Sequence, residues 1–358
     1  YKAQGEIFRA LMMFRMARLW GSFPVITTIA QTITSDNINE VYPTYYPPRK
    51  SPKECYEQII ADLTDAEKYA PDNDNSDRTK MTKTVAQAML AKVYAEKEVQ
   101  DYDKVITYAD KVIKTTGVEL EDSYETLWGY DETTKDCLKR NTKEGILEVH
   151  WTTGGGNWET WMYGRQLDNW DYYFTWAKWI TPSRDIINDF EKEGDEIRKN
   201  QAIVYYACTW SNYYPASNYP FMYKLRSSYS NIYWIRLADI ILMKAEAEAY
   251  KGNLDESAKL VNQIRKRAKL KELTSDKTNS KEAMIEAVLH ERRLELAFEG
   301  ERWFDLCRNN KVEKYLNGID NRDKGRIKQV KLFDSNSYLL PIPQTALDQN
   351  TNLVQNPG

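Results

Sequence analysis

Two carboxylates in one charged stretch of the chain have a spacing that could support acid–base chemistry. Glu295 and Glu299 lie four residues apart within residues 282–308, EAMIEAVLHERRLELAFEGERWFDLCR. On a helix this spacing brings both to one face, and a glycosidase needs two carboxyl groups about 5–10 Å apart. Because every helix meets that distance, the spacing alone favours an ion-pair network over an active site.

We call residues 282–308 the charged segment, and its pattern predicts a buried helix that Gly300 interrupts. Apolar residues recur at the spacing of one buried face. Its glutamates at i,i+4 spacing would repel one another unless arginines of this or another element lie between them. Opposite charges at i,i+3 are expected to pair within the segment, as Arg292–Glu295 and Glu299–Arg302.

Aromatic residues supply the second candidate for a functional surface. The chain holds 25 Tyr and 11 Trp, whose flat apolar faces and polar tips suit wet binding surfaces. Many of them fall in two stretches, residues 154–179 and 210–221, that are too rich in Gly, Asn and Pro for core helices. By contrast, Trp20, Trp128, Trp234 and Trp303 lie in helical patterns and are expected in the core.

Composition excludes several classes of protein. A net charge of −3 argues against nucleic acid as a partner, which would call for a basic stripe. No run of eighteen apolar residues is present, so no transmembrane helix is predicted. The four Cys have no CxxC spacing and there are only two His. We therefore expect no zinc site, no disulfide framework, no histidine-based triad and no cofactor.

Helical periodicity predicts that paired helices form most of the chain. A capping box at residues 51–54, with Pro at the first helical position, is a strong start signal. Small residues and short turns in two hairpins are typical of tetratricopeptide units, although the copies are not contiguous. The predicted helices are residues 1–19, a helix starting after residue 51, the hairpin 84–98 with 102–114, and the hairpin 235–250 with 254–268.

The middle of the chain has a different character. Short strands are predicted at residues 144–151 and 201–210, where β-branched and aromatic residues gather, and a short helix is expected after residue 181. The expected fold is all-α, with tetratricopeptide-like hairpins as a scaffold, an aromatic loop-rich face and a few short strands. We expect one domain, residues 1–358, made of a helical part (1–118), a loop-rich part (119–234) and a helical C-terminal part (235–358).

Several motifs, taken in order, resemble the SusD/RagB family of surface-exposed outer-membrane lipoproteins. Each is modest alone, but together they cover nearly the whole chain. They are residues 1–27 with an aromatic-Gly-x-x-Pro turn, residues 78–88, TPSRDIINDF (181–190) followed by DEIR (195–198), IRLADIILMKAEA (235–247), the charged segment, YLLPIP (338–343) and NTNLVQNPG (350–358).

The resemblance implies a binding protein without catalytic activity. It implies capture of an oligosaccharide, or in some members a peptide, on the extracellular face of the cell outer membrane. The ligand would pass to a SusC-like TonB-dependent transporter. The family carries a lipidated N-terminal Cys, and no Cys lies near Tyr1. The lipid anchor and the early helices, with any ligand contacts they make, are therefore expected to be absent from this sequence.

In proteins of this type sugar rings stack on Trp or Tyr, while Asn, Asp and Arg bind the hydroxyls. The alternative for each Trp is packing on the helical body or on the transporter. The predicted ligand-binding residues are Trp158, Trp161, Trp170, Tyr173, Trp176, Trp210, Tyr213, Tyr214, Asn157, Arg165, Asn169, Asp171 and Asn212.

Three hypotheses follow for function. The first is a glycan-binding or peptide-binding lipoprotein that serves import. The second is a glycoside hydrolase that uses Glu295 with Glu299, or loop acids such as Asp168 and Asp171. The third is a helical adaptor that binds only protein. For the charged segment we expect a structural role, in which its charges join the last hairpin to residues 340–343.

Overall fold

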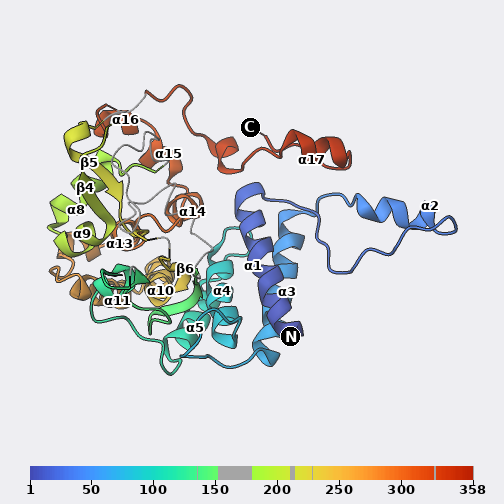
Figure 1. The fold of residues 1–358 in the computed structure, drawn as a ribbon, viewed down its shortest axis with the longest axis horizontal. Helices are drawn as coiled ribbons and strands as arrows, with labels where there is room; N and C mark the ends of the chain where they lie inside the picture. Colours follow the sequence, from blue (N-terminus) through green and yellow to red (C-terminus); the bar gives the residue numbers. More distant parts are fainter. Residues whose placement is uncertain (135, 152–179, 210–213, 228, 326–327, 358) are drawn as a thin grey trace.

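The computed structural model describes residues 1–358 except 135, 152–179, 210–213, 228, 326–327 and 358. Helices dominate this part of the chain and its strands are short (Figure 1). Within it, no helix combines the length and the apolar composition that crossing a membrane requires.

The N-terminal half contains α1 (Lys2–Trp20), α2 (Ile38–Val41), η1 (Tyr42–Tyr45), α3 (Pro52–Tyr69), α4 (Lys83–Ala95), α5 (Tyr102–Ile113), α6 (Glu125–Trp128), β1 (Tyr130–Asp131), β2 (Asp136–Cys137) and β3 (Gly145–Val149). After the undescribed stretch come α8 (Arg184–Glu193), α9 (Glu196–Ala202), β4 (Ile203–Tyr206), η2 (Ala216–Asn218), β5 (Tyr219–Met222) and β6 (Ile232–Arg236). The C-terminal part contains α10 (Leu237–Lys251), α11 (Leu254–Arg267), α12 (Ser275–Thr278), α13 (Lys281–Glu295), α14 (Arg302–Arg308), α15 (Val312–Leu316), α16 (Ile319–Arg322), η3 (Ser335–Tyr338) and α17 (Gln344–Gln349).

Local signals fix several helix ends as predicted. At the start of α3, Ser51 Oγ accepts the N–H of Glu54 at 3.3 Å, and Glu54 Oε2 accepts the N–H of Ser51 at 2.9 Å. Pro52 follows at the first helical position, where its missing N–H costs nothing. Gly252 closes α10 in the left-handed conformation with φ 86°. The capping box and the turn between the last two hairpin helices are therefore confirmed.

One large hydrophobic core runs through the helix pairs. Helix α1 packs on α3, α3 on α4 and α4 on α5, while α10 lies against α5, α11 and α13. Twelve of the fifteen residues of α10 are buried, and its alanines at positions 245, 247 and 249 are completely so. Small side chains let the neighbouring helices approach closely. Both predicted hairpins, α4–α5 and α10–α11, are confirmed.

A two-stranded antiparallel sheet precedes α10 and shortens the helix predicted there. Strand β6 pairs with β3, with Gly145 opposite Arg236 and Val149 opposite Ile232. The predicted helix from residue 235 therefore starts only at Leu237. The reason is non-local, because Ile235 and Arg236 complete a ladder whose other strand lies about ninety residues earlier. The strand predicted at 144–151 is confirmed in β3, whereas β6 was not predicted.

A second small sheet and a second core lie beside the C-terminal end of α13. Strands β4 and β5 are antiparallel, with Ile203 opposite Met222. Phe190 of α8 and Phe221 of β5 are fully buried in the same cluster as Leu294 of α13. The helix predicted after residue 181 is confirmed as α8, whereas the strand predicted at 201–210 is shorter: β4 covers only Ile203–Tyr206, and residues 201–202 belong to α9.

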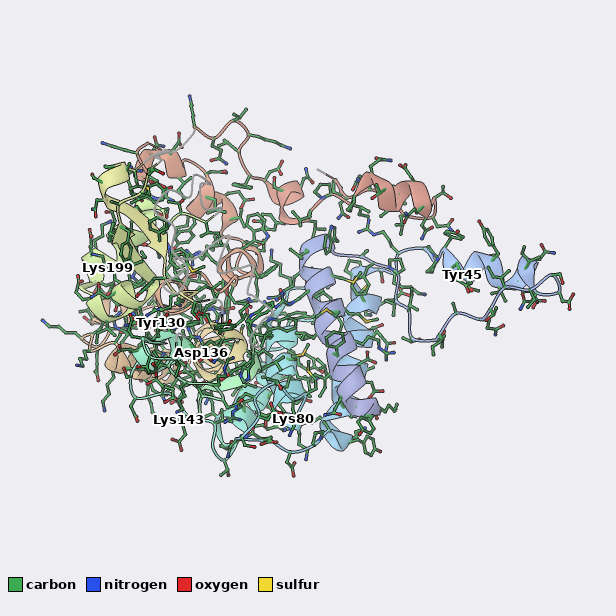
Figure 2. All side chains as sticks on the ribbon, in the orientation of Figure 1. Tyr45, Lys80, Tyr130, Asp136, Lys143 and Lys199 are labelled. Carbon is green, nitrogen blue, oxygen red and sulfur yellow. The ribbon has the colours of Figure 1, made fainter. Side chains whose placement is uncertain are left out.

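The loop after α1 and the C-terminal residues form an arm away from the helical body. We call residues 25–50 and 339–356 the arm; in Figure 1 its two parts extend to the right of α1 and α3, and Figure 2 labels Tyr45 on it. Arg49 donates to the backbone oxygens of Trp20 at 3.0 Å and Val354 at 2.5 Å. Asn350 Nδ2 donates to the oxygen of Pro47 at 3.0 Å. These bonds hold the two parts together.

Helix α13 ends five residues before the glycine that was predicted to interrupt it. Its last residue is Glu295, and α14 starts at Arg302. The carbonyl of Glu295 accepts bonds from Arg236 Nη2 at 2.8 Å, Tyr124 Oη at 2.8 Å and Lys224 Nζ at 3.2 Å. Side chains from elsewhere in the chain therefore satisfy this helix end, and the N–H of residue 299 is not needed.

Candidate functional site

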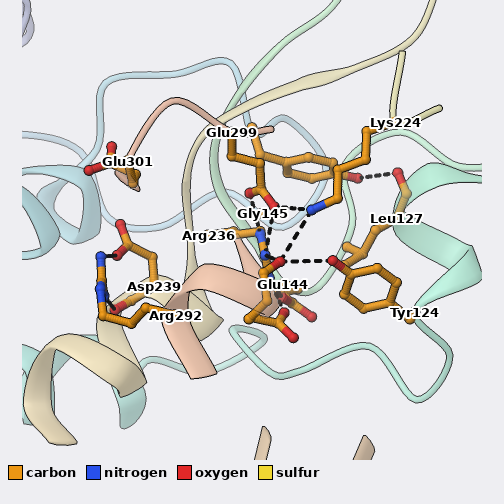
Figure 3. Close-up of polar contacts among 12 residues, drawn as sticks. Tyr124, Leu127, Glu144, Gly145, Lys224, Arg236, Asp239, Arg292, Glu299 and Glu301 are labelled. Carbon is orange, nitrogen blue, oxygen red and sulfur yellow. Dashed lines mark hydrogen bonds and ion pairs between the residues drawn. The ribbon is translucent and has the colours of Figure 1, made fainter. Parts of the chain in front are cut away.

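The carboxylates of the charged segment are matched by arginines from other elements. Arg198 Nη1 of α9 lies 2.6 Å from Glu291 Oε1 and 3.1 Å from Glu295 Oε2. Arg236 at the end of β6 lies 2.6 Å from Glu295 Oε1. It also lies 2.7 Å from Glu299 Oε2 (Figure 3). The repulsion expected between these glutamates is thus relieved as anticipated, by arginines that lie between them.

Glu295 is unsuited to be the acid of a glycosidase. It is fully buried and also pairs with Arg267 of α11. Burial alone would raise its pKa, but the charges of Arg267, Arg236 and Arg198 outweigh that effect and hold the pKa well below its ordinary value. A general acid needs a raised pKa. The pair Glu295 and Glu299 therefore belongs to a structural ion-pair network, while the loop acids Asp168 and Asp171 lie outside the described residues.

The pairs expected within the charged segment do not form. Arg292 Nη2 instead lies 2.8 Å from Asp239 Oδ1 of α10 and 2.9 Å from Asp305 Oδ1 of α14. Figure 3 shows Arg292 and Asp239 apart from the group around Arg236. Arg302 donates from Nη1 to the backbone oxygen of Leu289 at 3.0 Å. Because the helix ends at Glu295, residues 299 and 302 do not share a helical face.

The charged segment also does not join the last hairpin to residues 340–343. Among the described residues, its ion-pair partners outside the segment include residues of α1, α4, α8, α9, α10, α11 and α15, Arg236 of β6 and Lys224 after β5. Residues 340–343 are held by the first helix, where the N–H of Leu340 donates to the oxygen of Leu19 at 2.7 Å. The expectation was wrong because the charges of this segment that form ion pairs are largely buried, whereas residues 340–343 lie at the surface.

Most of the predicted aromatic surface lies outside the described residues, and those residues keep the status of a prediction. Tyr214 is the exception. Its ring is buried, its hydroxyl donates to the oxygen of Pro182 at 2.9 Å, and the guanidinium of Arg184 lies 4.1 Å from the ring centre. The residues outside the description are Trp158, Trp161, Trp170, Tyr173, Trp176, Trp210, Tyr213, Asn157, Arg165, Asn169, Asp171 and Asn212.

The residues that follow the first aromatic stretch contact the described part of the second. Thr181 and Pro182 follow the first stretch closely, and Tyr214 directly follows undescribed residues 210–213 of the second. Besides the bond between Tyr214 and Pro182, Thr181 Oγ1 lies 2.9 Å from Tyr219 Oη. Thr181 and Pro182 therefore lie against the same small core as Tyr214 and Tyr219, formed by α8, β4 and β5.

A cavity of about 470 Å³ opens beside this anchor point. Its walls come from Ile180 and α8, from the turn between α13 and α14, and from α15 and α16. Trp303 of α14 lines it, with its ring centre 5.7 Å from that of Phe333. Trp303 is half-buried, as are Trp20 and Trp234, so of the four tryptophans expected in the core only Trp128 is fully within it.

Some charged groups on the cavity walls have ion-pair partners among the described residues, and one does not. Asp185 is engaged by Arg293 at 2.8 Å and Arg322 at 3.0 Å. Burial would raise the pKa of Asp185, but these arginines lower it, so the group stays ionised. Arg302 forms no ion pair with any described residue, and burial lowers its pKa to about 10, which leaves it charged at neutral pH. Sequence reasoning missed this cavity, because elements separated by more than a hundred residues enclose it.

No group of three or more His, Cys, Asp or Glu side chains in the described ranges is arranged to hold a metal ion. His150 Nε2 lies 2.7 Å from Glu148, and His290 Nε2 lies 3.1 Å from Glu193. Each of these two histidines thus has a carboxylate neighbour.

Comparison with known proteins places the chain in one family. A model described as the SusD family matches residues 92–358, and one described as starch-binding associating with outer membrane matches residues 1–95. A SusD-like protein, P2, from Formosa agariphila is 27% identical over 391 residues, which cover 99% of this chain and 73% of the relative.

Solved structures agree on the fold. A SusD superfamily protein from Parabacteroides distasonis has a TM-score of 0.75 at 25% identity, covering 99% of this chain and 78% of that one. A laminarin-binding SusD-like protein has a TM-score of 0.70 at 23% identity, with coverage of 99% and 78%. The all-α, tetratricopeptide-like architecture with few short strands is thus confirmed, and the chain belongs to the SusD family.

Proposed function

We propose that this protein binds an oligosaccharide at the extracellular face of the outer membrane and delivers it to a SusC-like TonB-dependent transporter. The observation that carries the proposal is the contact of Thr181 and Pro182, which follow the first aromatic stretch, with Tyr219 and Tyr214 of the second. Rings from both stretches would then contribute to one surface, where sugar faces stack on Trp and Tyr. Family membership and the laminarin-binding relative support a glycan as ligand.

The ion-pair network supports a binding role because it makes the base of this surface rigid. Lys224 follows β5 closely, and its Nζ lies 2.6 Å from Glu299 Oε1. Arg198 ties α9, which leads into β4, to α13. A site on fixed elements loses less entropy when it binds ligand than a site on free loops does. The charges that first suggested catalysis would therefore act as support for binding.

The exposed apolar residues of the arm favour binding to a protein partner. Ile29 is 97% exposed, Ile26 58% and Tyr42 51%. Exposed apolar side chains gathered on one projecting element mark interaction sites more often than ordinary surface does. Bonds from Arg49 to the body would keep the arm in place for docking. We assign this surface as the docking site for the transporter. The lipid anchor of the family would hold this protein in the membrane that contains the transporter.

Calorimetry with a panel of neutral oligosaccharides, together with product analysis, tests the proposal. The double variant Trp170→Ala with Trp176→Ala should lose at least about tenfold in affinity, since each ring contributes stacking energy and buried area. Tyr69→Ala is the matched control, because Tyr69 is an exposed aromatic at the end of α3. Unchanged affinity in the double variant would show that the site lies elsewhere. Released reducing ends would favour a hydrolase.

A further inference from the structure

The cavity beside α8 has the size and walls of a ligand site in its own right. Its volume of about 470 Å³ lies within the range of small-molecule pockets, about 300–1,000 Å³. Ile186, Phe298, Trp303 and Ile319 contribute apolar surface from four separate elements. A cavity lined in this way takes an apolar group of the size of an aromatic or branched aliphatic side chain.

Polar groups on the walls are already engaged, which disfavours a sugar here. The carboxylate of Asp185 is taken by two arginines. Thr181 Oγ1 bonds Tyr219, and Ser183 Oγ accepts the N–H of Ile186 at 3.2 Å as the cap of α8. The hydroxyls of a pyranose would therefore find few partners, and burying them unpaired is costly.

Arg302 is the exception, since no carboxylate of the described residues forms an ion pair with it. A guanidinium has five N–H donors, and the structure records one bond for Arg302, to the oxygen of Leu289. That oxygen lies inside α13, where the N–H of residue 293 already serves it. The guanidinium lies 4.8 Å from the ring centre of Tyr315. By contrast, Arg292 and Arg293, which also line the cavity, each pair with two aspartates.

We propose that this cavity binds a monocarboxylate with an apolar body, whose carboxylate pairs with Arg302 and whose body lies against Ile186, Phe298 and Trp303. Arginine binds a carboxylate through two parallel N–H bonds, and a partly buried site strengthens them. A free aromatic or branched acid and the C-terminal residue of a peptide share this chemistry. The site is additional to the oligosaccharide surface and does not depend on it.

Calorimetry on the full chain with N-acetylphenylalanine and its amide tests the carboxylate. We expect the acid to bind at least tenfold more tightly than the amide. The tripeptide Ala-Ala-Phe, as free acid and as amide, distinguishes the sources. If it binds more tightly than N-acetylphenylalanine the source is a peptide, and if it binds more weakly the source is a free acid. Equal binding of acid and amide, or binding of neither, would overturn the proposal.

Variants locate the site. Arg302→Met should abolish the preference for acid over amide, whereas Arg9→Met, which removes an arginine on α1 far from the cavity, should preserve it. If Arg302→Met unfolds, Ile319→Glu serves instead, because it places a competing carboxylate in the cavity and leaves Arg302 in the chain. A preference that survives these changes in folded protein rejects Arg302 as the carboxylate partner.

Discussion

The charged segment contains two arginine environments that differ in one respect. Arg292 is fully buried, and its charge is met by the carboxylates of Asp239 and Asp305. Arg302, ten residues later, lies at a cavity wall, and among the described residues its one hydrogen bond goes to a carbonyl oxygen. An arginine whose donors are all matched stabilises the fold, whereas one with donors left over can bind a ligand. Residue type alone does not distinguish these roles.

Glu96 shows the same contrast for a carboxylate. It forms no ion pair in the described part of the chain, although it lies near Arg308 and Arg18. Burial raises its pKa to about 7, and the two arginines offset this only in part. Glu295, with three arginines around it, has a pKa shifted in the opposite direction. We therefore expect the stability of the protein to respond differently to mutation and pH at carboxylates with ion-pair partners and at those without them.

The largest effect should come from breaking the matched group. Arg236→Met leaves Glu144, Glu295 and Glu299 buried with fewer partners, and should cost about 3–5 kcal/mol of unfolding free energy. Urea denaturation followed by circular dichroism would measure this. Lys53→Met, in an exposed pair with Glu57, should change nothing measurable. A loss below about 1 kcal/mol for Arg236→Met would mean that the network contributes little to stability.

The pH dependence of stability should reveal the unmatched carboxylate. The pKa of Glu96 is about 7 in the folded chain, against an ordinary value of 4.5. The folded state thus binds this proton more tightly, so its stabilising effect is full below pH 4.5 and is lost as the pH rises through 7. Wild type should lose about 1–3 kcal/mol relative to Glu96→Gln between pH 5 and 8. Parallel urea midpoints for both proteins over this range would contradict the assignment.

The change expected to be smallest is in ligand affinity at the cavity, and it tests whether charge controls binding there. Asp185→Asn removes a carboxylate from Arg293 and Arg322, which adds unmatched positive charge to the wall. Affinity for N-acetylphenylalanine should then rise about two- to fivefold, the size of a partly screened charge interaction. Affinity for the amide should stay the same. An equal rise for acid and amide would point to a change in cavity shape instead of charge.

Much of the scaffold could be predicted because its signals are local. The capping box at Ser51 and Glu54, the glycine after α10 and the apolar stripes of α4, α5, α10 and α11 each act within a few residues. The motifs over residues 181–198, 235–247 and 282–308 indicated the family for the same reason. Of the predicted site, the structure describes only Tyr214, whose ring is buried and whose hydroxyl is bonded.

Sequence by itself determined the long helices of the two hairpins and the burial of the charged segment. Tertiary structure decided which charges meet. Arg236 reaches Glu144 across 92 residues, and Arg292 reaches Asp239 across 53. It also ended α13 at Glu295 and made residues 232–236 a strand. Ion pairs and strand ladders join distant residues, and their energy depends on burial that only the folded chain provides. Pattern within one segment therefore could not show that Arg302 would have no ion-pair partner in the described part of the fold.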